Sequence, residues 1–120
     1  MIFHKKDADL VAFKANDGTL LKELMHPVSD HLNITYSVAH ASVDVNAASL
    51  PHKLKSSESY YILKGTGMMH IEKKVFEVSE GDIFLVPENA EQYIENTGSV
   101  ELVFLCIVEP YWRADEDELI

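Results

Sequence analysis

Short segments rich in Val, Ile, Leu, Phe and Tyr, separated by Gly, Asn, Asp and Pro, limit what this chain can fold into. Segments of this composition with turn residues between them are typical of an antiparallel sandwich or barrel. We therefore predict an all-β fold, with helix confined at most to the two ends of the chain. The expected strands are residues 19–25, 34–45, 60–63, 68–71, 75–78, 83–86, 91–94 and 100–108.

The last expected strand is unusual, because residues 102–108 are apolar at every position. A strand of an open sheet normally turns one polar face to water. We expect this strand to lie centrally, or to be covered on one face by the N-terminal segment or by a second subunit. Its Cys106 is the single cysteine of the chain and is expected to be a small buried side chain.

The length of the chain fits one domain, since 120 residues and 13.5 kDa are close to the commonest domain size. We expect a single domain over 1–120, with its core at about 19–108 and a short C-terminal tail at 109–120. The tail carries the only Trp, Trp112. This side chain is expected either to anchor the tail on the outside of the core or to stack on a ligand.

Acidic residues outnumber basic ones, 20 against 10, which gives a formal net charge of -10. Charge of this sign repels phosphate backbones, so nucleic acid is not expected as a partner. No segment approaches the ~20 apolar residues that cross a bilayer, and the N-terminus shows no secretory signal. A lone cysteine cannot form an internal disulfide, which is compatible with a reducing compartment. From these three observations together we expect a cytoplasmic protein that does not associate with membranes.

The middle of the chain carries His52, Glu58 and Gly65, with six residues between the Glu and the Gly. This spacing resembles the first half of the signature of the cupin superfamily, which reads His-x-His, three or four residues, Glu, six residues, Gly. Leu54 stands where that pattern has its second His.

The second half of the signature reads Gly, five residues, Pro-x-Gly, two residues, His, three residues, Asn. Gly81, Pro87 and Asn96 match it. Asn89 stands where Gly is usual, and Gln92 stands where the last His is usual. The resemblance implies a jelly-roll β-barrel, also called a double-stranded β-helix, and a homodimer of the kind common among cupins.

The resemblance also implies that His52, Leu54, Glu58 and Gln92 meet inside the barrel, where typical cupins hold three His and one Glu around a divalent metal. We predict that a metal binds through His52, Glu58 and Gln92. Binding is expected to be loose, because an amide oxygen is a poor donor and Leu54 donates nothing. Zn, Mn, Fe and Ni are not distinguished. His40, mid-strand among small residues, is a candidate extra ligand.

The same residues have a second interpretation, in which no metal is bound. His52 and Glu58 then form a buried hydrogen-bonded pair that Gln92 completes, while Leu54 fills the space of the missing ligand. Both interpretations stay open at the level of sequence.

A pocket for a small molecule is expected inside the barrel, and we expect it to be lined by His52, Leu54, Glu58, Tyr60 and Gln92. The first hypothesis is a protein that binds a small polar metabolite. The alternative is a metal-dependent isomerase or epimerase of a sugar or sugar phosphate, in which Glu58 or His52 moves a proton. Similar small cupins are described as resembling mannose-6-phosphate isomerase.

A phosphorylated substrate needs a cation beside the pocket, which provides a criterion. Lys53, Lys55 and Lys64 are the basic residues near the signature, and strand parity or turn position predicts that they face outward. This counts against a phosphate. A third hypothesis is a structural or regulatory dimer, whose interior would be too collapsed to admit any ligand.

Overall fold

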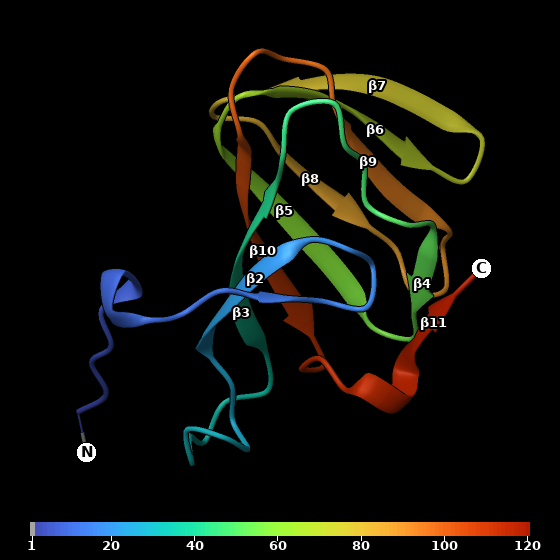
Figure 1. Cartoon of the computed structure of the whole chain (residues 1–120). Coiled ribbons are helices and arrows are strands. Elements are labelled where there is room, and N and C mark those ends of the chain that lie inside the picture. The colour runs from blue at the N-terminus through green and yellow to red at the C-terminus, as the bar shows by residue number, and fades with distance from the viewer. Residues whose placement is uncertain (1) are drawn as a thin grey trace.

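The computed structural model describes residues 2–120 and consists of antiparallel strands in two sheets that face each other as a barrel (Figure 1). The predicted all-β fold is confirmed. Only two short 3-10 turns accompany the strands in this part of the chain, and both lie near its ends. The elements are η1 (Asp7–Asp9), β1 (Phe13–Lys14), β2 (Leu20–Met25), β3 (Ser37–Val43), β4 (His52–Leu54), β5 (Ser57–Lys64), β6 (Thr66–Ile71), β7 (Lys74–Ser79), β8 (Ile83–Val86), β9 (Gln92–Asn96), β10 (Leu102–Glu109), η2 (Ala114–Glu116) and β11 (Asp117–Leu119).

The chain passes repeatedly from one sheet to the other. One sheet has the order β1-β2-β3-β10-β5-β8, and the other has the order β11-β4-β9-β6-β7. Strands β4 and β5 follow each other closely in sequence but belong to different sheets. Inward side chains of β4 therefore lie across the barrel interior from inward side chains of β5, which is what brings the signature residues together.

The apolar strand β10 lies between β3 and β5, as predicted for a strand that is apolar on both faces. Its register is fixed on both sides, because Leu105 pairs with His40 on β3 and with Tyr61 on β5. Cys106 is buried and free, as expected.

Three strands were not predicted: β1, β4 and β11. Each has only two or three residues, so none is long enough to show an alternation of polar and apolar side chains.

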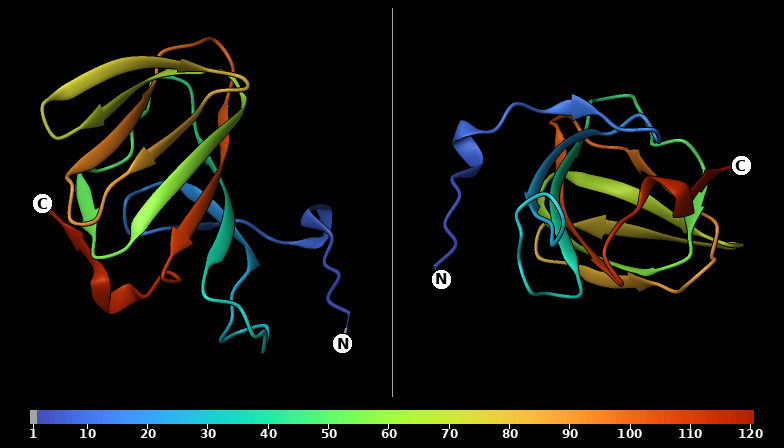
Figure 2. Two further views of the ribbon diagram at one scale, coloured as in Figure 1. Left: turned by 180° about the vertical axis from the view of Figure 1, so that it is seen from behind. Right: turned by 90° about the horizontal axis from the view of Figure 1, so that it is seen from below.

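The C-terminal tail is part of the fold and not a free extension of the core. Its β11 joins the edge of the smaller sheet by pairing with β4, and in the view from below the segment after β10 crosses the end of the barrel (Figure 2).

Two positions show why the turns need their residues. Gly65, between β5 and β6, has φ +91, and a Cβ there would lie 2.8 Å from the carbonyl oxygen of Glu101. Asn89, which replaces the usual Gly of the signature, has φ 61. Asn tolerates this left-handed conformation better than most side chains, so the exchange leaves the turn intact.

The apolar core fills one end of the barrel. Ile62, Met69, Ile94 and Leu102 come from four strands of the two sheets, and each is 0% exposed. Burying an aliphatic side chain of this size contributes about 1.5–3 kcal/mol. No helix within residues 2–120 has the length and apolar character to cross a membrane. The cytoplasmic location stays a prediction.

Candidate functional site

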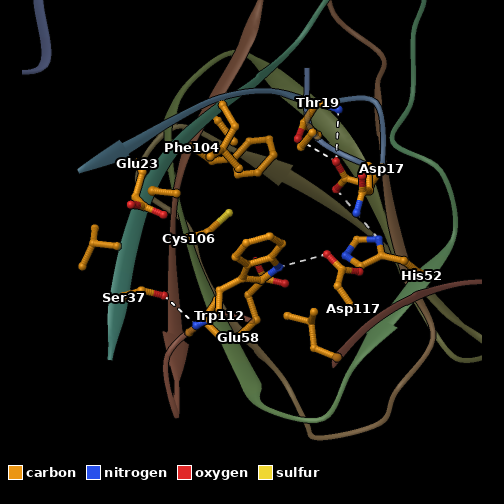
Figure 3. Close-up of a pocket in the computed structure, with 18 of the residues that line it drawn as sticks. Asp17, Thr19, Glu23, Ser37, His52, Glu58, Phe104, Cys106, Trp112 and Asp117 are labelled. Atoms are coloured by element: carbon orange, nitrogen blue, oxygen red, sulfur yellow. Dashed lines mark hydrogen bonds and ion pairs between the residues drawn. The ribbon is translucent and has the colours of Figure 1, made fainter. Parts of the chain in front are cut away.

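A cavity of about 340 Å³ lies inside the barrel, at the end away from this apolar core (Figure 3). The larger sheet forms much of its wall, and β4 closes it from the smaller sheet. Trp112 and Asp117 of the C-terminal segment complete the wall. Four of the predicted lining residues border the cavity: His52, Leu54, Glu58 and Tyr60.

Gln92 departs from the prediction, because it is not among the cavity-lining residues of the described chain. It is 1% exposed and lies behind the wall. Its Nε2 donates to Glu58 Oε1 at 2.9 Å, and its Oε1 accepts from the hydroxyl of Tyr60. Both ends of the amide are thus engaged, so Gln92 joins Tyr60 to Glu58 in one buried chain of hydrogen bonds.

Burial sets the protonation of this chain. It raises the pKa of Glu58, an effect that the nearby His52 and the hydrogen bond from Gln92 only partly oppose. Burial also raises the pKa of Tyr60 and of Cys106 well above their ordinary values. The phenol and the thiol therefore stay protonated, while Glu58 holds its proton more readily than an exposed carboxyl.

His52 is held in a defined orientation. It lies opposite Gln92 in the strand pairing of β4 with β9. Its Nδ1–H donates to the carbonyl oxygen of Leu50 at 3.1 Å, and the same nitrogen lies 3.8 Å from Asp17 Oδ2. In the neutral ring this leaves Nε2 as an acceptor. Asp17 is itself fixed, because its Oδ1 accepts from the hydroxyl of Thr19 at 2.7 Å.

The C-terminal segment contributes side chains that sequence reasoning placed differently or missed. Trp112 borders the cavity, so it is not confined to the outside of the core as one of the two expectations had it. Its Nε1 donates to Asp117 Oδ2 at 3.0 Å, and its backbone N–H donates to Ser37 Oγ at 2.9 Å. The other oxygen, Asp117 Oδ1, is buried and has no hydrogen-bond partner among residues 2–120.

His40 does not join the cluster that it was a candidate to complete. Strand alternation turns Ala39 and Ala41 toward the cavity and His40 toward the outer face of β3. There its Nε2 lies 3.8 Å from Asp7 Oδ2. Ala39 and Ala41, the small neighbours that made His40 a candidate ligand, form part of the cavity wall, and the imidazole of His40 lies on the opposite face of the strand.

The donor set fits a metal poorly. The oxygen of Gln92 accepts from Tyr60 behind the cavity wall, and Leu54 offers no donor. No group of three or more His, Cys, Asp or Glu side chains within the described chain is placed to hold a metal ion. Within this cluster, His52 has its Nδ1 oriented by a backbone carbonyl, as metal-ligating His residues usually do.

Sequence reasoning missed Asp17 and Asp117, which both border the cavity. Asn16-Asp17-Gly18 is a turn sequence and could have indicated the β1–β2 hairpin that carries Asp17. Asp117 gave no signal, because it lies in a run of acids that reads as a solvated tail.

These features define a small β-barrel protein with a cavity of ligand size beside a buried polar cluster. The cupin domain model matches residues 39–108, and the chain belongs to the cupin family. The jelly-roll fold implied by the signature is thereby confirmed.

Three known proteins illustrate what the chain is similar to. The uncharacterized protein MJ1618 of Methanocaldococcus jannaschii is 37% identical over 105 residues, which cover 87% of this chain and 83% of the relative. An oxalate-binding protein of Thermotoga maritima is 37% identical over 51 residues, 42% of each chain. The structure of the polyketide cyclase RemF of Streptomyces resistomycificus superposes with a TM-score of 0.84 over 100% of this chain and 86% of that chain. At 16% identity, the last likeness shows the fold alone. The names of the second and third relatives refer to small organic molecules.

Proposed function

We propose that the protein binds a small organic molecule inside the barrel. The observation that supports this most directly is the cavity of about 340 Å³, which lies in the range of roughly 300–1,000 Å³ typical of ligand sites. A purely structural dimer with a collapsed interior would need no such space.

The wall of the cavity offers both apolar and polar contacts to a ligand. Leu54 and Phe104 are buried apolar side chains that border it. His52 presents an acceptor nitrogen, and Glu58 presents a carboxyl whose pKa is raised by burial. A few convergent polar groups in an apolar cavity are what orients a small metabolite.

A cavity-filling variant tests this proposal. Ala39 borders the cavity from β3, so Ala39→Leu is expected to reduce its volume while keeping an apolar wall. Fragments that bind the wild type in ligand-observed NMR are expected to lose binding in this variant. Ala47→Phe, at an exposed site outside the cavity, is the matched control and should leave binding unchanged. A screen without hits, or hits that Ala39→Leu retains, would contradict the proposal.

A second candidate function is isomerisation or epimerisation of a sugar. It is favoured by Glu58 and His52, which border one cavity and belong to the residue types that act as general acids and bases. One group would take the proton from the carbon beside the carbonyl while the other gives a proton to the carbonyl oxygen, which forms an enediol. In isomerisation the second enediol hydroxyl then loses its proton and the former carbonyl carbon gains one, whereas in epimerisation the proton returns to the same carbon on its other face. Incubation of free aldoses and ketoses in D₂O is expected to exchange that C–H, and Glu58→Gln should abolish the exchange. Unchanged exchange in the variant would remove Glu58 from the mechanism.

The phosphorylated form of this substrate is not supported. Lys14 is the cationic side chain at the cavity, and it is exposed. Lys53 and Lys55 border a separate depression together with Glu116 and Glu118. Their charge is therefore shared with acids and not directed into the barrel.

Metal binding stays a prediction with a direct test. Elemental analysis of untagged wild-type protein and of His52→Ala compares the two interpretations of the cluster. From the engaged amide of Gln92 we expect less than one metal per chain in the wild type. One metal per chain in the wild type and none in the variant would instead establish a metal site.

We also propose that the protein forms a homodimer through the outer face of the larger sheet. Outward positions of β5 and β8 carry Tyr61, Ile83 and Leu85, which are 39%, 70% and 57% exposed. Tyr61 pairs with Ile83, and Leu85 pairs with Ser59, so the patch is contiguous. An exposed apolar patch of this kind marks an interaction surface, and a two-fold contact covers it on both copies at once.

The mass in solution tests the dimer. Light scattering after gel filtration is expected to give twice the chain mass for the wild type and the single mass for Leu85→Glu. Val75→Glu, an equally drastic change at a residue 51% exposed on β7 of the other sheet, should stay dimeric. A monomeric wild type would remove the proposal.

A further inference from the structure

The charged side chains at the cavity are mostly acidic. Four carboxyl residues border it, from the β1–β2 hairpin, β2, β5 and β11: Asp17, Glu23, Glu58 and Asp117. Among the described residues that line the cavity, Lys14 alone is a lysine or arginine, and it is exposed. The cavity therefore favours a positive ligand and opposes an anion such as the oxalate named for one relative.

Protein donors leave part of this acceptor capacity unused. Asp17 accepts from Thr19 through Oδ1, and Asp117 accepts from Trp112 through Oδ2. Asp117 Oδ1 is buried without any partner in the part of the chain that the structure describes. A carboxylate oxygen can accept more than one hydrogen bond, so Asp17 and Asp117 can accept from a ligand as well as from Thr19 and Trp112.

Aromatic rings stand beside these acids. Phe104 and Tyr60 border the cavity and stack on each other with their ring centroids 5.1 Å apart. The indole of Trp112 is fixed through its bond to Asp117, and Figure 3 shows both side chains on the same side of the cavity. Aromatic faces next to carboxylates are the surroundings in which proteins recognise organic ammonium groups.

We propose that the cavity selects an organic amine, with Asp117 accepting from the ammonium group and Trp112 flanking it. The apolar body of the ligand then lies against Phe104 and Leu54, which border the same space. This inference rests on the proposed ligand-binding function and specifies the chemical class of the ligand. Asp117 is its specificity-determining residue.

A matched series of probes tests the selection on the unmodified protein. 2-Phenylethylamine, 2-phenylethanol and phenylacetate share one aromatic body and differ in a cationic, neutral or anionic head. Titration by NMR is expected to give the amine the highest affinity, about tenfold or more above the alcohol, because a hydrogen bond to a charged group is the stronger one. Phenylacetate and oxalate are expected not to bind measurably.

Asp117→Asn assigns the effect to one residue. The amide can still accept from Trp112, but it carries no negative charge. We expect about tenfold to hundredfold weaker binding of the amine and little change for the alcohol. Asp115→Asn, in the same segment but away from the cavity, is the control, and the fluorescence of the single Trp verifies that the segment remains folded.

The outcomes separate this inference from the proposed function. Phenylacetate binding as tightly as the amine, or Asp117→Asn binding the amine as the wild type does, overturns the amine selection alone. The same holds if no probe binds while other fragments occupy the cavity. If neither probes nor fragments bind, both proposals fail.

Discussion

The two ends of the barrel interior are built from the same strands but are filled differently. Along β5, the inward side chains change from Glu58 through Tyr60 to Ile62. Ile62 belongs to the end where core side chains are fully buried, whereas Glu58 borders the cavity. Tyr60 lies between them and stacks on Phe84 with their ring centroids 4.8 Å apart.

The difference shows that strand alternation decides which residues face inward but not whether the interior is filled. At the packed end, the long antiparallel pair β6 and β7 brings Met69 and Val78 into the core. At the other end, closure falls to the short hairpin of β1 and β2 and to the segment that ends in β11. Short strands cover an opening without filling the space behind it.

The largest expected loss of stability comes from a substitution at the packed end. Ile94→Ala removes a side chain that is 0% exposed, and we expect it to lower the free energy of unfolding by about 2–5 kcal/mol through lost burial and a new cavity. Leu54→Ala, beside a space that already exists, should cost about half as much. Urea denaturation measures both, and equal losses would mean that the two ends are packed alike.

A smaller effect is expected from the layer between the ends. Tyr60→Phe leaves Gln92 Oε1 buried without its donor, which should lower the free energy of unfolding by about 1–3 kcal/mol. Tyr61→Phe on the outer face of the same strand is the control and should change it by less than about 0.5 kcal/mol. If Tyr60→Phe left the free energy of unfolding unchanged, the hydroxyl would add no stability to the hydrogen bonds that join Tyr60, Gln92 and Glu58.

The packed end was largely predictable from sequence, and the cavity end was not. The strands expected at 68–71 and 75–78 lie within β6 and β7 of the packed end, because their composition and the Gly-containing turn before them act locally. The three residues of β4 have no pattern of their own. They become a strand because β9 and β11 lie on either side of them.

The candidate site was predictable only as far as the cupin signature reaches. The signature brought His52, Glu58 and Gln92 together, and the pairing of His52 with Gln92 agrees with it. The amide of Gln92 is held behind the cavity wall by the hydroxyl of Tyr60. Tyr60 is not a position of the cupin signature, so the signature could not predict this contact. Asp117 enters through contacts between distant parts of the chain, so local sequence could not reveal its place.

Protonation offers a milder way to sharpen the contrast between the ends. The pKa of Glu58 is raised by burial, so between the unfolded value and the folded value the native state binds more protons than the unfolded state. Stability therefore falls as pH rises through that window, and the penalty is absent below the unfolded value, where both states are protonated.

Glu58→Gln removes this titration while keeping a group that can accept from Gln92. At pH 8 we expect its melting temperature to exceed that of the wild type by a few degrees. The difference should vanish near pH 4. Glu77→Gln, at an exposed site on β7, should show no such trend, and a difference independent of pH would mean that Glu58 is not the titrating group.

The smallest expected effect comes from the turns at the two ends. Asn89 already has φ 61, and its backbone N–H donates to the carbonyl oxygen of Leu54 at 2.7 Å beside the cavity end. Because Gly adopts this conformation freely and keeps that N–H, Asn89→Gly should change the free energy of unfolding by less than about 1 kcal/mol. Gly65→Ala at the packed end should cost more, since it adds a Cβ against Glu101 at φ +91. If denaturation showed the reverse order, the turn beside the cavity would be the more constrained of the two.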